Sequence, residues 1–422
     1  MRVLVIGGGG REHALAWKIA QSPLVEALLA APGNPGIARH ATCMPVAADA
    51  VDGLGALARR ERIDLTVVGP EVPLVAGLAD RLAEAGLTVF GPGARAAAIE
   101  GSKAFAKDLM ARHGIPTARF ATFDDPARAR RHCREVGAPI VVKADGLAGG
   151  KGAIVCRTLD EADAAVAECM EVKAFGAAGT TVVIEEFLTG EEVSFFAFSN
   201  GDDALPLAAA QDHKTVFDGD RGPNTGGMGA YSPVASFDAA MERRVMETIV
   251  RPAIAALAKE GAPYRGVLYV GLMLTSDGPR VFEFNCRFGD PECQALMVRW
   301  PGDLVPLLLA AARGAAWPAL AAWPPHASVC VALASGGYPG KYRTGLPIEG
   351  IEAAEAKPGI QVFHAGTALR GGTLVTAGGR VLGVTALAGD LPAAIRAAYD
   401  AVKEIRFEGM HYRTDIGRRR KP

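Results

Sequence analysis

A predicted strand close to residue 285 carries three polar side chains that alternate with apolar ones. The polar residues are Glu283, Asn285 and Arg287, and the apolar residues are Phe282, Phe284 and Cys286. Because side chains alternate along a strand, we expect the polar set on one face and the apolar set, buried, on the other. Carboxylate and amide oxygens with a nearby guanidinium suit Mg²⁺ and a polyphosphate. The alternative is a half-exposed strand with a polar outer face.

A run of glycines at residues 7–10 follows a short apolar strand and precedes Arg11. A dinucleotide site would need a third glycine, but Glu12 or His13 stands at that place. The acidic residue expected about 20 positions on, at the end of the second predicted strand, is also absent, because residues 30–33 read Ala-Ala-Pro-Gly. The sequence therefore argues against a nicotinamide site. Free amides at a helix start, together with an arginine, instead suit a phosphate. A tight strand-to-helix turn without a ligand is the alternative.

Lys143 ends another predicted strand, and residues 146–152 form a glycine-rich turn before the next strand. The turn is not a Walker A loop, because Asp145 and Gly152 stand where that motif needs glycine and a hydroxyl residue. A hairpin loop of this composition can close over phosphates as a flexible lid whose amides donate hydrogen bonds. A plain glycine hairpin is the alternative.

Two further segments carry weaker signals. Residues 183–192 join two predicted strands through a short acidic connection, which could pair its backbone with adenine and point a carboxylate at ribose hydroxyls. Residues 211–234 have no regular pattern, and a structureless loop of this length inside a domain is usually functional. Its glycines and small polar donors suit a small carboxylate or phosphate. Solvated turn glutamates and a mobile surface loop are the respective alternatives.

The elements that must position these groups change character along the chain. In the first hundred residues, short β-branched runs alternate with helical stretches, as in a parallel α/β sheet, whose ligands bind at the carboxyl ends of the strands. Those ends are residues 7–10, 32–36 and 69–71. From about Ser102, strands paired across glycine turns predict an antiparallel α+β unit. From Ser328 the chain is rich in strands and turns.

Composition narrows the class of protein. With 45 basic and 46 acidic residues among 422, the net charge is −1, so no global basic field is available to hold nucleic acid or an anionic membrane. The seven cysteines include no C-x-x-C pair, which argues against a disulfide scaffold or a zinc knuckle and fits a reducing cytosol. The most apolar window, residues 304–323, is broken by prolines and Arg313, so we expect a buried helix and no membrane span.

Taken in order, these pieces resemble the ATP-grasp ligases, and within them the phosphoribosylamine–glycine ligase family. The resemblance rests on ten stretches: VLVIGGGGREHALAW, VGPEVPLVAG, EGSKAFAKDLMARHGIPTA, PIVVKADGLAGGKG, VIEEFLTGEEVSFF, QDHKTV, GPNTGGMGAYSP, EFNCRFGDPE, GGYPGKYRTG and VFHAGT. Two positions depart from the common family form, because Gly149 stands where alanine is usual and Cys293 where threonine is frequent. Neither departure removes a charge or a ligand.

The resemblance implies three domains and a reaction. The domains are an N-terminal α/β parallel-sheet domain (residues 1–102), an α+β ATP-grasp domain (residues 103–326) with a mobile lid in a flap at about residues 120–190, and a strand-rich C-terminal domain (residues 327–422). The reaction would join glycine to 5-phosphoribosylamine through a glycyl phosphate, using ATP and Mg²⁺ or Mn²⁺, in purine biosynthesis. The implied partners are these small molecules, with no nucleic acid and no membrane, and the protein would be a cytoplasmic monomer.

The resemblance also assigns residues to roles, position by position. The residues implied in catalysis are Lys143 and Arg287. Those implied in ATP binding are Lys103, Lys143, Gly149, Gly150, Glu186, Phe187, Leu188 and Glu192. The implied metal ligands are Glu283 and Asn285. Those implied in substrate binding are Gly8, Gly9, Arg11, Gly33, Asn34, Asp212, Lys214, Asn224, Thr225, Gly289 and Asp290.

Three other classes of protein compete with this interpretation. The GGREH and GPNTGGMG stretches argue against another ATP-grasp enzyme, such as a carboxylase or a relative from the purine pathway. The misfit at Glu12 argues against an NAD-dependent dehydrogenase. A nucleotide-binding protein without catalysis would keep the acidic connection but lose Glu283, Asn285 or Arg287, and all three are present.

Overall fold

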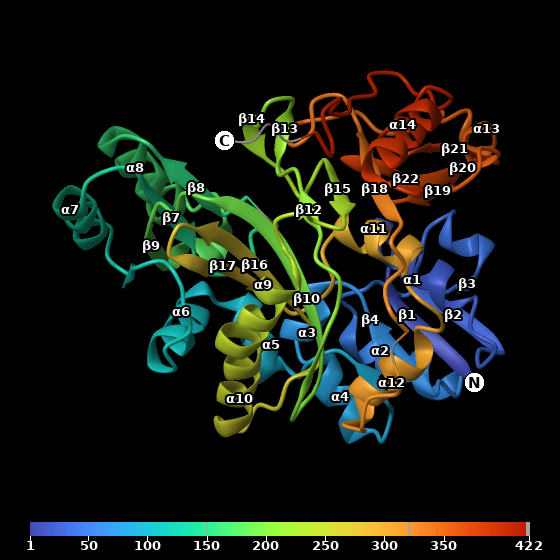
Figure 1. Ribbon diagram of the computed structural model, residues 1–422, viewed down its shortest axis with the longest axis horizontal. Coiled ribbons are helices and arrows are strands. Elements are labelled where there is room, and N and C mark those ends of the chain that lie inside the picture. Colours follow the sequence, from blue (N-terminus) through green and yellow to red (C-terminus); the bar gives the residue numbers. More distant parts are fainter. Residues whose placement is uncertain (150, 320, 419–422) are drawn as a thin grey trace.

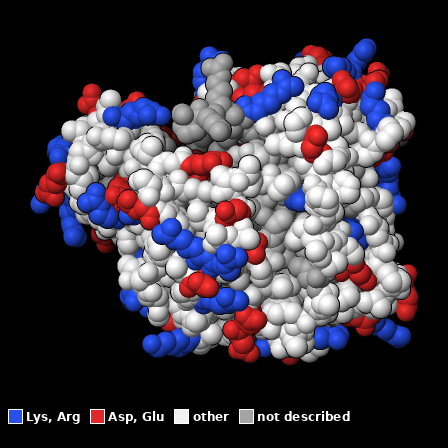
Figure 2. Space-filling model, viewed as in Figure 1, with Lys and Arg blue, Asp and Glu red and all other residues white. Residues whose placement is uncertain are grey.

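The computed structural model describes residues 1–149, 151–319 and 321–418, and these form four larger sheets and two two-stranded ribbons. In Figure 1 the N-terminal sheet (blue) lies beside the C-terminal sheet (red), and the sheet next to α7 and α8 lies on the other side of the central strands. Figure 2 shows basic and acidic side chains interspersed over the face in view. Within the described residues, no helix is both long enough and apolar enough to span a bilayer.

The N-terminal unit is a five-stranded parallel sheet, as the alternation of apolar runs and helices predicts. Its strands are β1 (Arg2–Gly7), β2 (Ala27–Pro32), β3 (Thr42–Cys43), β4 (Leu65–Val68) and β5 (Val89–Phe90). Its helices are α1 (Gly10–Ile19), α2 (Val51–Arg60), α3 (Glu71–Val75), α4 (Leu78–Glu84) and α5 (Ala94–Gly101). From β1, the chain first adds β2 and β3 on one side of the sheet and then β4 and β5 on the other side. Ligands of open α/β sheets bind in the crevice that such a change of side leaves at the carboxyl ends of the strands.

The central unit is the antiparallel sheet β11-β10-β16-β17. Its strands are β10 (Glu191–Asn200), β11 (Ala204–Pro206), β16 (Arg265–Thr275) and β17 (Gly278–Asn285). The helices around it are α6 (Lys103–Arg112), α9 (Ala239–Val245), α10 (Arg251–Lys259), α11 (Glu292–Arg299) and α12 (Val305–Arg313). One apolar cluster contains Ile6 and Leu74 of the N-terminal unit as well as Phe195 and Leu268 of this sheet, so the two units share a core.

A second antiparallel sheet, β6-β9-β7-β8, forms the flap. Its elements are β6 (Phe120–Phe123), α7 (Pro126–Val136), β7 (Ile140–Ala144), β8 (Ala153–Cys156), α8 (Leu159–Val166) and β9 (Val182–Glu186). The antiparallel pairing predicted from Ser102 onward is therefore confirmed. Buried residues of the flap, such as Val142, Cys156 and Ile184, form a cluster of their own. A separate core allows this unit to move as one body.

The C-terminal unit is the five-stranded sheet β12-β15-β18-β22-β19, flanked by two ribbons. The strands of the sheet are β12 (Gln211–Asp212), β15 (Gly229–Ser232), β18 (Ala327–Ala334), β19 (Ile360–His364) and β22 (Arg380–Ala388). The ribbons are β13 (Thr215–Phe217) with β14 (Arg221–Asn224), and β20 (Thr367–Arg370) with β21 (Thr373–Thr376). The helices are α13 (Ile351–Glu355) and α14 (Leu391–Val402).

The prediction that residues 211–234 have no regular structure is wrong. Four short strands lie in this segment, and β15 pairs with β18, with Gly229 opposite Val331 and Ser232 opposite Ser328. The partner strand lies about a hundred residues further along the chain, so no local pattern of side chains could reveal the pairing.

Helix α11 brings the units together. It packs against α1 of the N-terminal unit and against β15, β18 and β22 of the C-terminal sheet. Its first residue, Glu292, is 4% exposed and its neighbour Cys293 is fully buried. Residues 289–292 therefore lie where the N-terminal, central and C-terminal units meet.

Two histidines connect the N-terminal and C-terminal units. The backbone N–H of His364 donates to Nδ1 of His13 at 2.7 Å, and the two rings lie 5.6 Å apart. Burial lowers the pKa of His13 well below its usual value and lowers the pKa of His364 to about 4, and the charge of Arg39 acts in the same direction on both. Since an accepting Nδ1 carries no proton, this contact requires a neutral His13.

We expect titration of these two histidines to decrease the free energy of unfolding as the pH is lowered from 7.5 to 5.5. Proton uptake by Glu292, whose pKa is raised to about 7 in the folded protein, partly offsets this decrease and does so equally in the variant below. Both histidine pKa values are depressed in the folded protein, so the unfolded chain takes up protons first, below about pH 6.5, at a cost of about 1 kcal/mol per histidine over this interval. Urea unfolding at the two pH values measures the loss. In His13→Asn the amide oxygen replaces Nδ1 without titrating, so the loss should be about 1 kcal/mol smaller. An equal loss in both proteins would contradict this origin.

Candidate functional site

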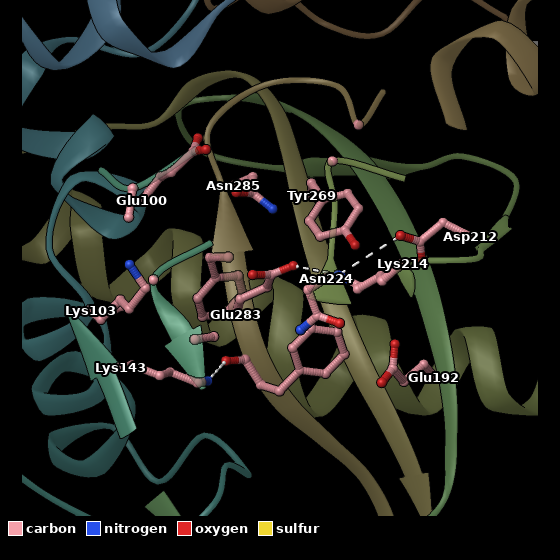
Figure 3. A pocket seen from close by; sticks show the side chains of 18 of the residues that line it. Glu100, Lys103, Lys143, Glu192, Asp212, Lys214, Asn224, Tyr269, Glu283 and Asn285 are labelled. Atoms are coloured by element: carbon pink, nitrogen blue, oxygen red, sulfur yellow. Dashed lines mark hydrogen bonds and ion pairs between the residues drawn. The ribbon is translucent and has the colours of Figure 1, made fainter. Parts of the chain in front are cut away.

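A cavity of about 430 Å³ lies where the flap, the central sheet and the N-terminal and C-terminal units face one another. Figure 3 shows side chains from several elements pointing into it, among them Lys103, Lys143 and Glu283. Arg380 of β22 also lines it. The cavity is therefore assembled from all parts of the chain.

Most of the residues singled out in the sequence line this cavity. They are Arg11, Lys103, Lys143, Gly149, Glu186, Phe187, Leu188, Glu192, Asp212, Lys214, Asn224, Thr225, Glu283, Asn285, Arg287, Gly289 and Asp290. Four others, Gly8, Gly9, Gly33 and Asn34, are not among the lining residues, and Gly150 lies outside the described residues. The structure thus brings most of these residues together around one cavity, whereas the role of each residue remains a prediction.

Strand β17 carries Glu283 and Asn285 into the cavity, but its side chains do not alternate as predicted. Gly271 opposes Glu283 while the next residue, Leu272, opposes Val281, so Phe282 is an extra residue in a bulge. Phe282 is half-buried and lines the cavity beside Glu283. The prediction that it is buried on the opposite face is therefore wrong, whereas Phe284 and Cys286 are buried as expected.

Lys214 neutralises the carboxylate of Glu283. Its Nζ lies 3.0 Å from Oε1 of Glu283 and 3.9 Å from Oδ2 of Asp212. Burial alone would raise the pKa of Glu283, but Lys214 lowers it to about 2. Burial alone would lower the pKa of Lys214, but Asp212 and Glu283 raise it well above its usual value. Both groups are therefore charged at neutral pH.

The donor set at the end of β17 fits a hard divalent cation. Glu283 offers an ionised carboxylate, and the side chain of Asn285, two residues further along the strand, lines the same cavity. Carboxylate and amide oxygens are ligands that such cations take. Within the described residues, no group of three or more His, Cys, Asp or Glu is arranged to hold a metal ion.

Arg287 follows β17 and reaches across to the N-terminal unit. Its Nε donates to Oε2 of Glu71 at 3.0 Å, and its Nη2 lies 2.8 Å from Oε1 of Glu100. Burial would lower the pKa of Arg287, but the two carboxylates raise it, so the guanidinium stays charged. Burial raises the pKa of Glu100, which also accepts the Cys286 N–H at 2.7 Å. The wall of the cavity thus presents a fixed positive group.

Lys103 and Lys143 enter the cavity from α6 and β7 (Figure 3). The Nζ of Lys103 donates to the Gly146 carbonyl at 2.9 Å, and the Nζ of Lys143 donates to the Phe282 carbonyl at 2.8 Å. Burial lowers the pKa of Lys103, and the charge of Glu283 opposes this effect. Two lysines therefore lie near Glu283 of β17.

Glu185 was missed in the sequence and holds Lys143 in place. It is 3% exposed, and its carboxylate lies 2.9 Å from Nζ of Lys143 and 2.7 Å from Nζ of Lys107. Burial lowers the pKa of Lys107 to about 8, against the opposing charge of Glu185. The VIEE stretch contains this carboxylate, but without knowing which face of the strand is buried, Glu185 could not be told from Glu186.

The acidic connection between β9 and β10 lines another wall. Its Phe187 and Leu188 line the cavity, and so does Glu192 of β10, which is labelled in Figure 3. The carboxylate of Glu186 accepts the backbone N–H of Arg119 at 2.9 Å and lies 3.3 Å from Nη1 of Arg280. The side chain of Glu186 is thus engaged with arginines at the edge of the sheet.

Glu12, which stands where a dinucleotide site would need glycine, closes the first turn of α1. Its Oε2 accepts the N–H of Gly9 at 2.7 Å, and its Oε1 accepts Nε of Arg11 at 2.6 Å. Arg11 also donates from Nη1 to the Phe288 carbonyl at 3.1 Å. The glycine run therefore starts a helix whose arginine is directed towards the segment after β17.

The glycine run also contacts the loop after β2. A Cβ on Gly8 would lie 2.5 Å from the Gly33 carbonyl oxygen, so no side chain is possible at this crossing. Nδ2 of Asn34 donates to the Gly8 carbonyl at 2.9 Å and to the His364 carbonyl at 2.8 Å. Asn34 therefore ties both loops to the C-terminal unit.

Arg380 holds the segment that precedes β15. Its Nη1 donates to the carbonyls of Gly226 at 2.8 Å and Asp290 at 2.5 Å, and its Nη2 lies 3.4 Å from the Asp290 carboxylate. Burial would raise the pKa of Asp290, but Arg380 lowers it. The hydroxyl of Thr225 donates to the Lys214 carbonyl at 2.8 Å. Nothing in the sequence around Arg380 pointed to this contact.

Comparison with known proteins covers almost the whole chain. Phosphoribosylglycinamide synthetase matches through its N domain at residues 1–100, its ATP-grasp (A) domain at residues 101–293 and its C domain at residues 328–419. The phosphoribosylamine–glycine ligase of Rhizobium meliloti is 54% identical over 417 residues, which are 99% of this chain and 98% of the relative. That of Pseudomonas aeruginosa is 53% identical over 422 residues, again 99% and 98%.

Solved structures agree with this assignment. The crystal structure of phosphoribosylamine–glycine ligase from Thermotoga maritima matches with a TM-score of 0.86 and 34% identity. The match covers 98% of this chain and 100% of that one. The biotin carboxylase domain of the Hydrogenobacter thermophilus 2-oxoglutarate carboxylase matches with a TM-score of 0.75 and 18% identity, covering 97% and 91%, and shares the fold alone. The chain belongs to the phosphoribosylamine–glycine ligase family and has its ATP-grasp fold.

Proposed function

We propose that the protein joins glycine to 5-phosphoribosylamine, with conversion of ATP to ADP and phosphate, to give glycinamide ribonucleotide in purine biosynthesis. The observation that carries the proposal is the cavity in which Lys103, Lys143, Glu283, Asn285 and Arg287 converge, in a chain 54% identical over 99% of its length to a phosphoribosylamine–glycine ligase. We also expect a cytoplasmic monomer, divided at residues 1–102, 103–326 and 327–422 with a flap at about 120–190.

The proposed chemistry has two steps. A glycine carboxylate is a poor acyl donor, because attack on it would have to expel oxide. Transfer of the γ-phosphoryl group of ATP gives glycyl phosphate, from which an amine can displace phosphate. Such steps depend mainly on positioning and on neutralising charge. Lys103 and Lys143 would face the phosphates of ATP, and Arg287 would face the transferring group, since each presents a cation to the cavity.

Glu283 and Asn285 would hold Mg²⁺ or Mn²⁺, because they offer adjacent hard oxygen ligands on one strand. When bound, the cation neutralises phosphate oxygens. The adenine would meet the connection from Glu186 to Leu188, and the ribose would meet Glu192. The glycine-rich turn, with Gly149 and Gly150, would close over the phosphates as a lid.

The phosphoribosyl group would occupy the end of the cavity next to α1. Arg11 lines the cavity there. The loops with Gly8 and Gly9 and with Gly33 and Asn34, which do not themselves line the cavity, meet at the start of α1, and a helix start suits a phosphate. The segment with Asp212, Lys214, Asn224 and Thr225, together with Gly289 and Asp290, would contact the glycyl and ribosylamine groups. This division would put the acceptor and the nucleotide at different ends of the cavity.

Release of ADP that requires both glycine and freshly made ribosylamine tests the proposed function. Mass spectrometry should then find glycinamide ribonucleotide as the product. ADP release that needs bicarbonate in place of glycine would indicate a carboxylase, and binding of NADH would indicate a dehydrogenase. Either result would overturn the proposal.

The first prediction from the proposed function concerns the metal ligands. Asn285→Ala removes an amide oxygen from the proposed cation site, so turnover should fall about a hundredfold or more, in line with the several kcal/mol that such a cation supplies. Asn285→Asp keeps an oxygen and serves as the matched control, with much of the activity retained. Calorimetry should find adenosine binding unchanged in both. Near-normal turnover of Asn285→Ala at limiting Mg²⁺ would refute the metal assignment.

The second prediction concerns the helix start at Gly9. A Cβ there would lie 2.8 Å from Oε2 of Glu12 and 3.7 Å from Oδ2 of Asp290, so a branched side chain would crowd the proposed phosphoribosyl end. Gly9→Val should raise the apparent KM for ribosylamine about tenfold or more and leave that for ATP nearly unchanged. Gly389→Val, where a Cβ meets nothing within 4 Å, is the matched control. A shift in the ATP titration alone would assign the loop to the nucleotide.

A further inference from the structure

One buried carboxyl group that lines the cavity has no role in the scheme above. Glu292, the first residue of α11, is 4% exposed and lines the cavity beside Gly289. The hydroxyl of Ser194 donates to its Oε1 at 3.0 Å, and the same hydroxyl lies 2.9 Å from the hydroxyl of Tyr269. The Ser194 hydroxyl has one proton and donates it to Glu292, so in the contact between the two hydroxyls it is Tyr269 that donates to Ser194. Two hydroxyls from β10 and β16 therefore orient one oxygen of the carboxyl group.

The second oxygen, Oε2, lies beside Gly289, which has no side chain. A Cβ on Gly289 would lie 2.4 Å from Oε2 of Glu292, so only glycine leaves room for that oxygen. Gly289 itself lines the cavity. The carboxyl group thus has one oxygen held by Ser194 and the other beside a cavity-lining glycine.

Glu292 stands between the two ends of the cavity. On one side, Lys214, whose charge acts on Glu292, pairs with Glu283 of the proposed metal site. On the other side, Asp290 precedes it by two residues and lies next to the helix start at Gly9. Glycyl phosphate would form on the first side and ribosylamine would approach from the second. The Tyr269, Asp212 and Lys214 side chains around this point are visible in Figure 3.

The environment of Glu292 suits proton exchange near neutral pH. Burial raises its pKa to about 7, the charge of Asp212 adds to this effect, and Lys214 opposes it. Other ionisable groups that face it are Tyr269 on β16, Arg380 on β22, the thiol of the neighbouring Cys293 and that of Cys330 on β18. A base accepts a proton most effectively when its pKa lies close to the working pH.

The second step of the proposed reaction releases a proton that needs an acceptor. The ribosylamine nitrogen forms a bond to the acyl carbon, the bond from that carbon to the phosphate oxygen breaks, and phosphate leaves with the electron pair. The nitrogen begins with two hydrogens and ends with one in the amide. Glu283 is a weak base because Lys214 lowers its pKa to about 2, and Asp290 has its pKa lowered, with Arg380 beside it.

We propose that Glu292 accepts this proton from the ribosylamine nitrogen and so acts as the general base of amide formation. The inference rests on the proposed function, and it adds a catalytic residue that serves only the second step. The first step, phosphoryl transfer to a carboxylate, loses no proton and does not need Glu292.

Two acceptors of the glycyl group, ribosylamine and hydroxylamine, distinguish the two steps experimentally. Glu292→Gln keeps the size of the side chain and an oxygen that can accept from Ser194, but it cannot take up a proton at neutral pH. Turnover with ribosylamine should fall by about 10² to 10⁴-fold, with the KM values for ATP and glycine nearly unchanged. Glycine-dependent ADP release with hydroxylamine, a strong nucleophile that needs no base, should stay close to that of the unchanged protein.

The pH profile supplies a second readout. In the unchanged protein, kcat with ribosylamine should decline below about pH 7, and Ser194→Ala, which removes a donor to the carboxylate, should move this decline to higher pH. A structural role of Ser194 would lower activity at every pH without moving the profile. If Glu292→Gln fails to fold, as judged by circular dichroism, the Ser194→Ala profile decides the question alone.

Three results would overturn the inference. Normal ribosylamine turnover in Glu292→Gln would mean that the departing phosphate takes the proton. Equal losses with ribosylamine and hydroxylamine would place Glu292 in glycine activation, and an unmoved profile in Ser194→Ala would exclude Glu292 as the group that titrates. Failure of the proposed function would look different, because the unchanged protein would then release no ADP in response to glycine with either acceptor.

Discussion

The ion pairs of Arg287 with Glu71 and Glu100 set the geometry on which the cavity depends. Glu71 begins α3 directly after β4, Glu100 lies near the end of α5, and Arg287 follows β17. Removing one partner of a fully buried pair costs about 3–5 kcal/mol. Arg287 and Glu71 are only partly buried, so the cost here is smaller, but the two pairs together hold the end of β17 against the N-terminal unit. Glu283 and Asn285 lie on the same strand, and their position follows from this attachment. A group proposed to face the phosphoryl oxygens therefore also aligns the proposed ligands of a cation.

The lysines of the cavity are of two kinds, according to whether each one contacts a carboxylate or a neutral carbonyl. Lys107 is locked by the carboxylate of Glu185 at 2.7 Å, and giving up that pair in a buried place would be costly. Lys103 instead donates to the neutral carbonyl of Gly146, and a phosphate oxygen is a stronger acceptor for an ammonium than a carbonyl. Lys143 contacts both Glu185 and a carbonyl. An entering polyphosphate can thus recruit Lys103 and Lys143 while Lys107 keeps Glu185 in place.

The parallel and antiparallel sheets could be predicted from the sequence because their signals are local. Apolar runs such as residues 3–6 end at glycines, and Glu283 and Asn285 are two residues apart on one strand. The position of Phe282 could not be predicted, because the bulge depends on how β16 pairs with β17. The contacts of Arg380 and Glu185 were also out of reach, since their partners come from elements far apart in the chain. Local patterns thus predict elements and candidate groups, but the partners of each charge are set by tertiary packing.

The contacts of the C-terminal unit explain why the proposed acceptor end of the cavity requires the whole chain. Pairing of β15 with β18 and the contacts of Arg380 fix the segment with Thr225, while Asn34 bonds to the His364 carbonyl beside the glycine loops. The proposed nucleotide end is built from the flap and the central sheet, and the flap has a core of its own. Loosening of the C-terminal unit would therefore weaken the proposed ribosylamine end and leave the nucleotide end assembled. Glu292, at the start of the helix that packs against both outer units, lies where these two ends meet.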